Sequence, residues 1–245
     1  MWYNGQNDEG RIMVDLRSIV VGMVLMLKKY TCINITIYAE TNEEDYISGI
    51  FVLPLIGFAI GFIALLISSF KLFYDGFFVS MLILVFYVII TKLINLKDTY
   101  RTLNYYIKPI GQTEQLSGIV GITLIILMYF SLFRIVPSTA LVVMFVGGYS
   151  NLIILSAVIK RDKSNTSIIK YCTKYHIIAA FAISFLVASI FNYKLVISLS
   201  LTYIISVLVV SLLDEKIEVL PSSAEGFLIE ISQVLFLIIT YLMKL

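Results

Sequence analysis

Carboxylate side chains gather in two long polar connections of this sequence, where one apolar segment gives way to the next. The residues are Asp98, Glu114, Asp214, Glu215, Glu218 and Glu225. Several of them stand at the ends of apolar segments. If the protein acts on polar molecules, we therefore expect the reaction at the face that carries these connections.

Three of the acidic residues also have a simple structural interpretation. Asp98 and Arg101 are three residues apart, a spacing that places them on one helix face as a surface ion pair. Glu225 follows Ser222 by three residues, which is the pattern of a capping box that opens a helix. Glu230 lies one turn deeper, inside an apolar segment, where a carboxylate is costly and is a functional candidate by default. Pairing with a neighbouring helix would also account for Glu230.

Other residues that could bind ligands have less specific patterns. His176 has no second His or Cys at ligand spacing, which favours a packed interface over a metal site. The basic cluster from Lys160 to Lys174 could attract a polyphosphate, but anionic lipid headgroups explain it as well. The Asp75-Gly76 pair is typical of a turn. The sequence contains no Gly-rich phosphate loop, Walker motif, Cys-based metal site or nucleophile elbow.

The composition predicts the kind of element that must position these residues. Of the 245 residues, 60% are hydrophobic and 14% are charged, and the mean hydropathy is +0.96. A soluble domain has about 25% charged residues, so this chain is expected to be an integral membrane protein. A net charge of +2 gives no reason to expect nucleic acid as a partner. Two cysteines, Cys32 and Cys172, exclude a disulfide framework.

The apolar segments predict an all-α polytopic bundle of about seven transmembrane helices, because each is long enough to cross the hydrocarbon. They are 51–70, 77–96, 117–133, 135–159, 177–193, 195–213 and 226–243. An earlier stretch, 18–27, is too short to span and predicts an interfacial or re-entrant helix. The whole chain, 1–245, is then one membrane domain, with an N-terminal cytoplasmic or interfacial segment (1–50) and a transmembrane bundle (51–243).

The positive charges predict the orientation of this bundle. With seven alternating spans, the long connections share a face with the N-terminus, and fourteen of the 18 Lys and Arg residues fall there. The other face carries Lys71, Arg134, Lys194 and Lys244. Because cytoplasmic loops are rich in Lys and Arg, we expect the N-terminus and the long loops to be cytoplasmic, with the protein in the cell membrane.

Five segments resemble motifs of a known family in the same order. Tyr-Thr-Cys-Ile-Asn-Ile (30–35) resembles Phe-Leu-Thr-Arg-Ile-Pro-Val, and Leu-Pro-Leu-Ile-Gly-Phe-Ala-Ile-Gly (53–61) is similar to Phe-Pro-Leu-Val-Gly-Leu-Leu-Ile-Gly. Residues 93–103 occupy the place of Leu-Asp-Gly-Leu-Ala-Asp-Thr-x-Asp-Gly-Leu, 114–121 that of Asp-Ser-x-Ile-Gly-x-Phe-Gly, and 223–225 that of Thr-Gly-Asp. These motifs belong to the cobalamin synthase family, the adenosylcobinamide-GDP ribazoletransferases.

The match is incomplete at the acidic positions. Asp98 and Thr99 match the middle of the Asp motif, while Ile94 and Arg101 replace its flanking Asp residues. Glu114 stands for Asp in the next motif, and Asn151 stands where the family usually has Arg. The changes at the Asp motif make the site more positive, which opposes cation binding.

The resemblance implies an enzyme that joins α-ribazole, or its 5′-phosphate, to adenosylcobinamide-GDP and releases GMP. It implies magnesium as the cofactor, with Asp98, Glu114 and Glu225 as catalytic residues and metal ligands. Magnesium needs several oxygen ligands, and it would stabilise the charge of the leaving group. The implied partners are the two substrates and the lipid bilayer, and the sequence makes no prediction about the oligomeric state.

Three functions are compatible with these observations. The first is an active, divergent ribazoletransferase. The second is a family member that has lost catalysis and acts as a binding or assembly partner, because Ile94 and Arg101 replace acidic residues. The third is a small membrane transporter, which an internal repeat would favour, but the two halves of the hydropathy pattern show no convincing repeat.

Overall fold

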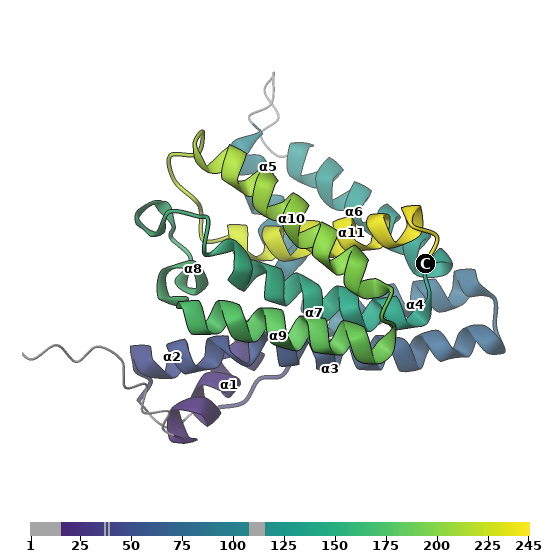
Figure 1. The fold of residues 1–245 in the computed structure, drawn as a ribbon, viewed down its shortest axis with the longest axis horizontal. Coiled ribbons are helices and arrows are strands. Elements are labelled where there is room, and N and C mark those ends of the chain that lie inside the picture. The colour runs from purple at the N-terminus through teal and green to yellow at the C-terminus, as the bar shows by residue number, and fades with distance from the viewer. Residues whose placement is uncertain (1–15, 37, 39, 108–115) are drawn as a thin grey trace, which may run out of the picture.

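The computed structural model describes residues 16–36, 38, 40–107 and 116–245, which fold into helices (Figure 1). The α-helices are α1 (Leu16–Tyr30), α2 (Glu43–Ile50), α3 (Leu53–Ser68), α4 (Gly76–Ile90), α5 (Ile94–Tyr106), α6 (Leu116–Ile135), α7 (Ser138–Leu155), α8 (Ser167–Tyr171), α9 (Lys174–Phe191), α10 (Leu195–Asp214) and α11 (Ala224–Leu242). Two short 3-10 turns, Ser69–Leu72 and Arg161–Lys163, complete the described elements. The predicted all-α membrane fold is confirmed.

Six helical segments are long and apolar enough to cross a membrane: α3 with its 3-10 extension, α6, α7, α9, α10 and α11. Together with the bent pair α4 and α5, they give up to seven spans, as the sequence predicts. The predicted segments and the observed helices agree closely except at this bent pair.

The second predicted span, 77–96, is wrong at its C-terminal end. The helix α4 stops at Ile90, and α5 starts again at Ile94 at an angle of 81°. Lys92 and Leu93 between them have φ values of 50° and 59°, in the left-handed region that ends a right-handed helix. Their apolar neighbours continue the hydropathy signal through the break, so the sequence pattern alone does not reveal it.

The helix α7 forms the centre of the bundle and is buried along nearly its whole length. It packs against α3, α9, α10 and α11. Gly57 and Gly61 of α3 allow a close approach to α7, because a Cβ atom at Gly57 would lie 2.6 Å from the Phe145 carbonyl oxygen. At Gly61 it would lie 2.7 Å from Val142 Cα. Small residues thus let α3 and α7 touch backbone to backbone.

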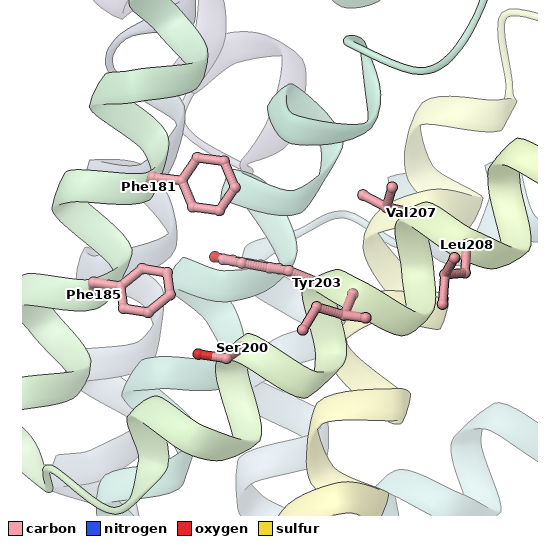
Figure 2. A pocket seen from close by; sticks show the side chains of 7 residues that line it. Phe181, Phe185, Ser200, Tyr203, Val207 and Leu208 are labelled. Carbon is pink, nitrogen blue, oxygen red and sulfur yellow. The ribbon is translucent and has the colours of Figure 1, made fainter.

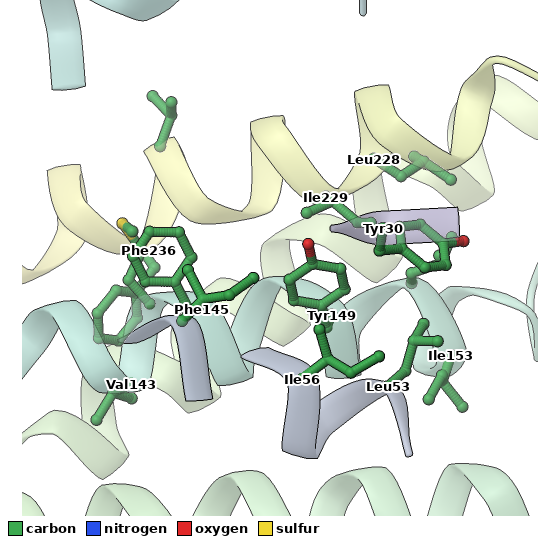
Figure 3. Packing of buried hydrophobic residues seen from close by; sticks show 14 of the residues in the cluster. Tyr30, Leu53, Ile56, Val143, Phe145, Tyr149, Ile153, Leu228, Ile229 and Phe236 are labelled. Carbon is green, nitrogen blue, oxygen red and sulfur yellow. The ribbon is translucent and has the colours of Figure 1, made fainter. Parts of the chain in front are cut away.

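The N-terminal helix α1 packs on α2 through a contact between Gly22 and Gly49, whose backbones leave no room for a Cβ atom. Its 15 residues are too few to span, in agreement with the sequence. Its last residue, Tyr30, enters the core beside Tyr149 of α7, with the rings edge to face at 5.6 Å (Figure 3). We call the end of the bundle that carries α1, α2 and α8 the loop end; the C-terminus lies at the other end (Figure 1).

Candidate functional site

The loop end brings together two of the predicted site residues, Asp98 of α5 and Glu225 of α11. The helices that carry them touch at Gly226, where a Cβ atom would lie 2.6 Å from Asp98 Cβ and 2.8 Å from Asn95 Cα. Only glycine allows α5 to come this close. The bend before Ile94 directs the first turns of α5 toward the start of α11, against which α5 packs. Asp98 is then near enough to Glu225 for the charge of Glu225 to affect its ionisation.

Glu225 is buried, with 3% of its surface exposed, and each of its carboxylate oxygens has a partner. Oε2 accepts a hydrogen bond of 2.6 Å from the Tyr30 hydroxyl and lies 2.5 Å from the Lys29 ammonium. Oε1 accepts a bond of 3.3 Å from the backbone N–H of Ile168. Glu225 therefore joins α11 to both α1 and α8.

The Lys29 ammonium has three hydrogen-bond partners, as many as it has protons. Besides Glu225, it donates to the Tyr46 hydroxyl at 2.9 Å and to Ser167 Oγ at 3.3 Å. Burial alone would lower the pKa of Lys29, but Glu225 and then Tyr46 outweigh it, and the pKa lies above its usual value. The ammonium is thus held in its charged form between α1, α2, α8 and α11.

Asp98 has a different environment from Glu225. Its side chain is half-buried, and no described residue donates a hydrogen bond to it. Burial and the nearby charge of Glu225 raise the pKa of Asp98 to about 6, although Arg101, Lys29 and Lys97 oppose the shift. A carboxyl with a pKa in this range can take up a proton near neutral pH.

Two structural interpretations from the sequence are not borne out at this site. The predicted capping box of Ser222 and Glu225 is wrong: α11 begins at Ala224 after Ser223, and the Glu225 carboxylate turns to Lys29 and Tyr30 instead. A charged partner is worth more to this buried carboxylate than a backbone N–H. Asp98 and Arg101 form no ion pair within 4 Å, whereas Lys29 and Glu225 do.

The predicted magnesium ligands do not form a ready-made metal site in the described residues. Glu114 lies outside them, and they contain no cluster of three or more His, Cys, Asp or Glu residues able to hold an ion. Glu225 already holds an ammonium where a metal would bind, so of the two predicted ligands that the structure describes, Asp98 is the open carboxylate. The magnesium site stays a prediction.

Glu230 lies in the interior of the bundle and is fully buried. The hydroxyl of Tyr87 on α4 donates to Oε1, and that of Tyr129 on α6 donates to Oε2 at 2.6 Å. Tyr129 also contacts Gln233 Oε1 at 2.9 Å. Pairing with neighbouring helices, one of the two interpretations from the sequence, is therefore present.

Two minor interpretations from the sequence are confirmed. His176 is buried at an interface: its Nε2 contacts the Ile47 carbonyl oxygen at 3.1 Å, and its ring lies 4.0 Å from that of Phe51. Asp75 caps α4 by accepting a bond of 2.8 Å from the Phe77 N–H, which agrees with a turn. Neither residue contributes to the loop-end site.

Sequence reasoning missed Lys29, Tyr30 and Tyr46. A signal for the first two exists, because the buried residues Gly22, Met26 and Tyr30 repeat every four positions along α1. This spacing marks the inward face of the helix, and Lys29 lies at its edge. No comparable signal marks Tyr46, which reaches the site through the packing of α2 on α1.

A pocket of about 370 Å³ opens between α9 and α10, away from these residues (Figure 2). Its lining is almost entirely apolar, with Phe181 and Phe185 from α9 and Tyr203, Val207 and Leu208 among those from α10. It contains no carboxylate, so it does not extend the site.

The comparison with known families gives one match. Residues 22–97, about a third of the chain, match the model of the family described as cobalamin-5-phosphate synthase. No curated protein and no solved structure matches the chain. The matched segment includes the motifs at 30–35 and 53–61 as well as Lys29 and Tyr46, and it ends one residue before Asp98. Through this segment, about a third of its length, the chain is similar to the cobalamin-5-phosphate synthase family.

Proposed function

We propose that the protein is a ribazoletransferase that joins α-ribazole, or its 5′-phosphate, to adenosylcobinamide-GDP. The proposal combines the family match with one observation: Asp98, a carboxyl without a hydrogen-bond partner among the described residues, lies beside the buried Glu225 at the loop end. The two carboxylates come from motif positions that are far apart in sequence.

In the reaction, a ribose hydroxyl oxygen attacks the phosphorus atom that carries the cobinamide arm. A new P–O bond to the ribose forms, the P–O bond to the GMP phosphate breaks, and GMP leaves with the bonding electrons. Asp98 takes the hydroxyl proton, a role supported by its partial exposure and its pKa of about 6. Glu225, tied to α1, α8 and α11, keeps the site assembled around Asp98.

Magnesium, implied by the family resemblance, would supply charge stabilisation at the diphosphate if it takes part. We assign it no step, because the Glu225 carboxylate is occupied by Lys29.

The test is turnover by the purified protein in lipid nanodiscs. Adenosylcobinamide-GDP and α-ribazole 5′-phosphate are supplied, and GMP and the cobamide product are measured. We expect turnover in the unchanged protein and a loss of at least about 100-fold in Asp98→Asn, the range that a general base contributes. Glu218→Gln removes the same charge from an exposed position on the same connection as Glu225 and should keep turnover. Binding of adenosylcobinamide-GDP without any GMP release would favour the non-catalytic family member instead.

We also propose that the loop end faces the cytoplasm, where nucleotide substrates are present. The support is the excess of Lys and Arg in the connections of this face. In a variant without Cys32 and Cys172, a cysteine at Lys170 should resist an impermeant thiol reagent in intact cells, while one at Lys71 should react. The reverse pattern would place the site outside.

A further inference from the structure

The side chains around Asp98 and Glu225 have an unusual balance of positive and negative charge for a site that binds a diphosphate. Lys29, Lys97 and Arg101 all lie close enough to Asp98 to affect its ionisation, and so does Glu225. Among the described residues, these three cations accompany two anions before any metal is bound. In the Asp motif of the family, the position of Arg101 carries an acid.

Lys29 occupies the position at Glu225 that a metal ion would need. Its ammonium lies 2.5 Å from Oε2, and its side chain is 32% exposed, against 4% for that of Glu225. A cation that arrives from solvent therefore meets the ammonium before the carboxylate. Tyr46 and Ser167 hold the ammonium in this place by their hydrogen bonds.

Lys97 and Arg101 are available for a different task. Both are exposed, and they are four residues apart on α5, so they project from the same side of the helix. Arg101 can donate two parallel hydrogen bonds to a phosphate group, and Lys97 can act as a point charge beside it.

From these positions we infer that cations of the protein replace magnesium at this site: Lys29 neutralises Glu225, while Lys97 and Arg101 bind the diphosphate of a nucleoside diphosphate ester. The inference rests on the proposed function for the identity of the ester. The inference makes a prediction that a magnesium-binding site would not meet: the unchanged protein binds its substrate without a divalent ion.

Equilibrium dialysis of adenosylcobinamide-GDP against the full chain in nanodiscs tests the inference. Affinity in EDTA should be within about threefold of that in millimolar magnesium. Arg101→Gln and Lys97→Gln should each weaken binding in EDTA by about tenfold, as expected for the loss of one charge-assisted contact. Lys216→Gln, an exposed cation on another connection of the same face, should leave affinity unchanged. Binding that disappears in EDTA, or that is unaffected by both α5 variants, would overturn the inference.

A second measurement tests Lys29 without relying on activity. In the unchanged protein, magnesium should leave the melting temperature unchanged. Lys29→Met frees the Glu225 carboxylate, so magnesium should then raise the melting temperature. If Lys29→Met does not fold, Lys29→Met combined with Glu225→Gln removes both charges. This double variant should fold, bind the substrate in EDTA and show no response to magnesium. A magnesium-induced rise in the unchanged protein that Glu225→Gln abolishes would contradict the role of Lys29.

The two proposals fail in different ways. Substrate binding in EDTA that depends on Lys97 and Arg101, with no GMP release under any condition, would sustain this inference and reject the transferase. Turnover that needs magnesium, with no binding in EDTA, would sustain the transferase and reject this inference.

Discussion

Glu225 and Glu230 lie five residues apart on α11, and the two buried carboxylates have different kinds of partner. Glu225, at the loop end, has an ammonium and a phenol as partners, and the ammonium still reaches water. Glu230, in the interior, has two phenols, and no described cation pairs with it. The comparison indicates that depth decides the choice of partner, because a lysine can keep its charge only where its end reaches solvent.

The largest effect is expected when the ion pair at the loop end loses its cation. Lys29→Met leaves the buried Glu225 carboxylate uncompensated, which should cost about 3 kcal/mol of unfolding free energy, measured by denaturant unfolding in detergent without magnesium. The double variant with Glu225→Gln should recover most of that loss. If Lys29→Met is as stable as the unchanged protein, the Lys29–Glu225 ion pair does not stabilise the fold.

The interior carboxylate should respond differently to the same kind of change. Glu230→Gln carries no charge, keeps an oxygen that accepts from one tyrosine hydroxyl and offers an N–H donor to the oxygen of the other, so stability should change by less than about 1 kcal/mol. Glu230→Ala leaves the Tyr87 hydroxyl without its acceptor and the Tyr129 hydroxyl with Gln233 Oε1 alone, and it should cost about 2–3 kcal/mol in the same assay. Equal losses for both variants would show that the hydroxyls do not depend on Glu230.

The contact that assembles the loop end should be sensitive to one methyl group. In Gly226→Ala the new Cβ meets Asp98 Cβ and the α5 backbone, so α5 must move away. We expect a loss of about 1–3 kcal/mol and reduced turnover. Gly76→Ala is a matched control, because its Cβ would meet no atom closer than 3.7 Å. A Gly226→Ala protein with full stability and turnover would mean that the separation of α5 and α11 is not critical.

The smallest effect concerns pH and distinguishes Asp98 from its neighbours. Burial and the Glu225 charge raise the pKa of Asp98 in the folded state to about 6, from its ordinary value of 3.8, against the opposing effect of Arg101, Lys29 and Lys97. The neutral acid is therefore favoured by folding, and its contribution to stability is complete below pH 3.8 and is lost as pH rises through about 6. Thermal melts of Asp98→Asn should lack this component, while Glu218→Gln should retain it.

The sequence predicts the membrane fold well, because an apolar segment long enough to span must form a helix in lipid. It also places Asp98 and Glu225 at the same membrane face, because each lies next to the end of a predicted span in a long polar connection. It does not reveal the bend at Lys92 and Leu93, because the residues on either side are as apolar as a continuous span. Nor does it pair Lys29 with Glu225, because that contact depends on how α1 docks against helices much later in the chain.

The bend between α4 and α5 also depends on a distant segment. At the end of α4, the Ile90 carbonyl oxygen accepts a hydrogen bond of 2.6 Å from the backbone N–H of Cys32, just after α1. A carbonyl released by a broken helix costs several kcal/mol if it faces lipid without a partner. A chain without α1 should therefore favour a straight α4, and α5 would then point away from α11. The segment that follows α1 thus satisfies the last carbonyl group of α4 at the bend from which α5 runs to Asp98.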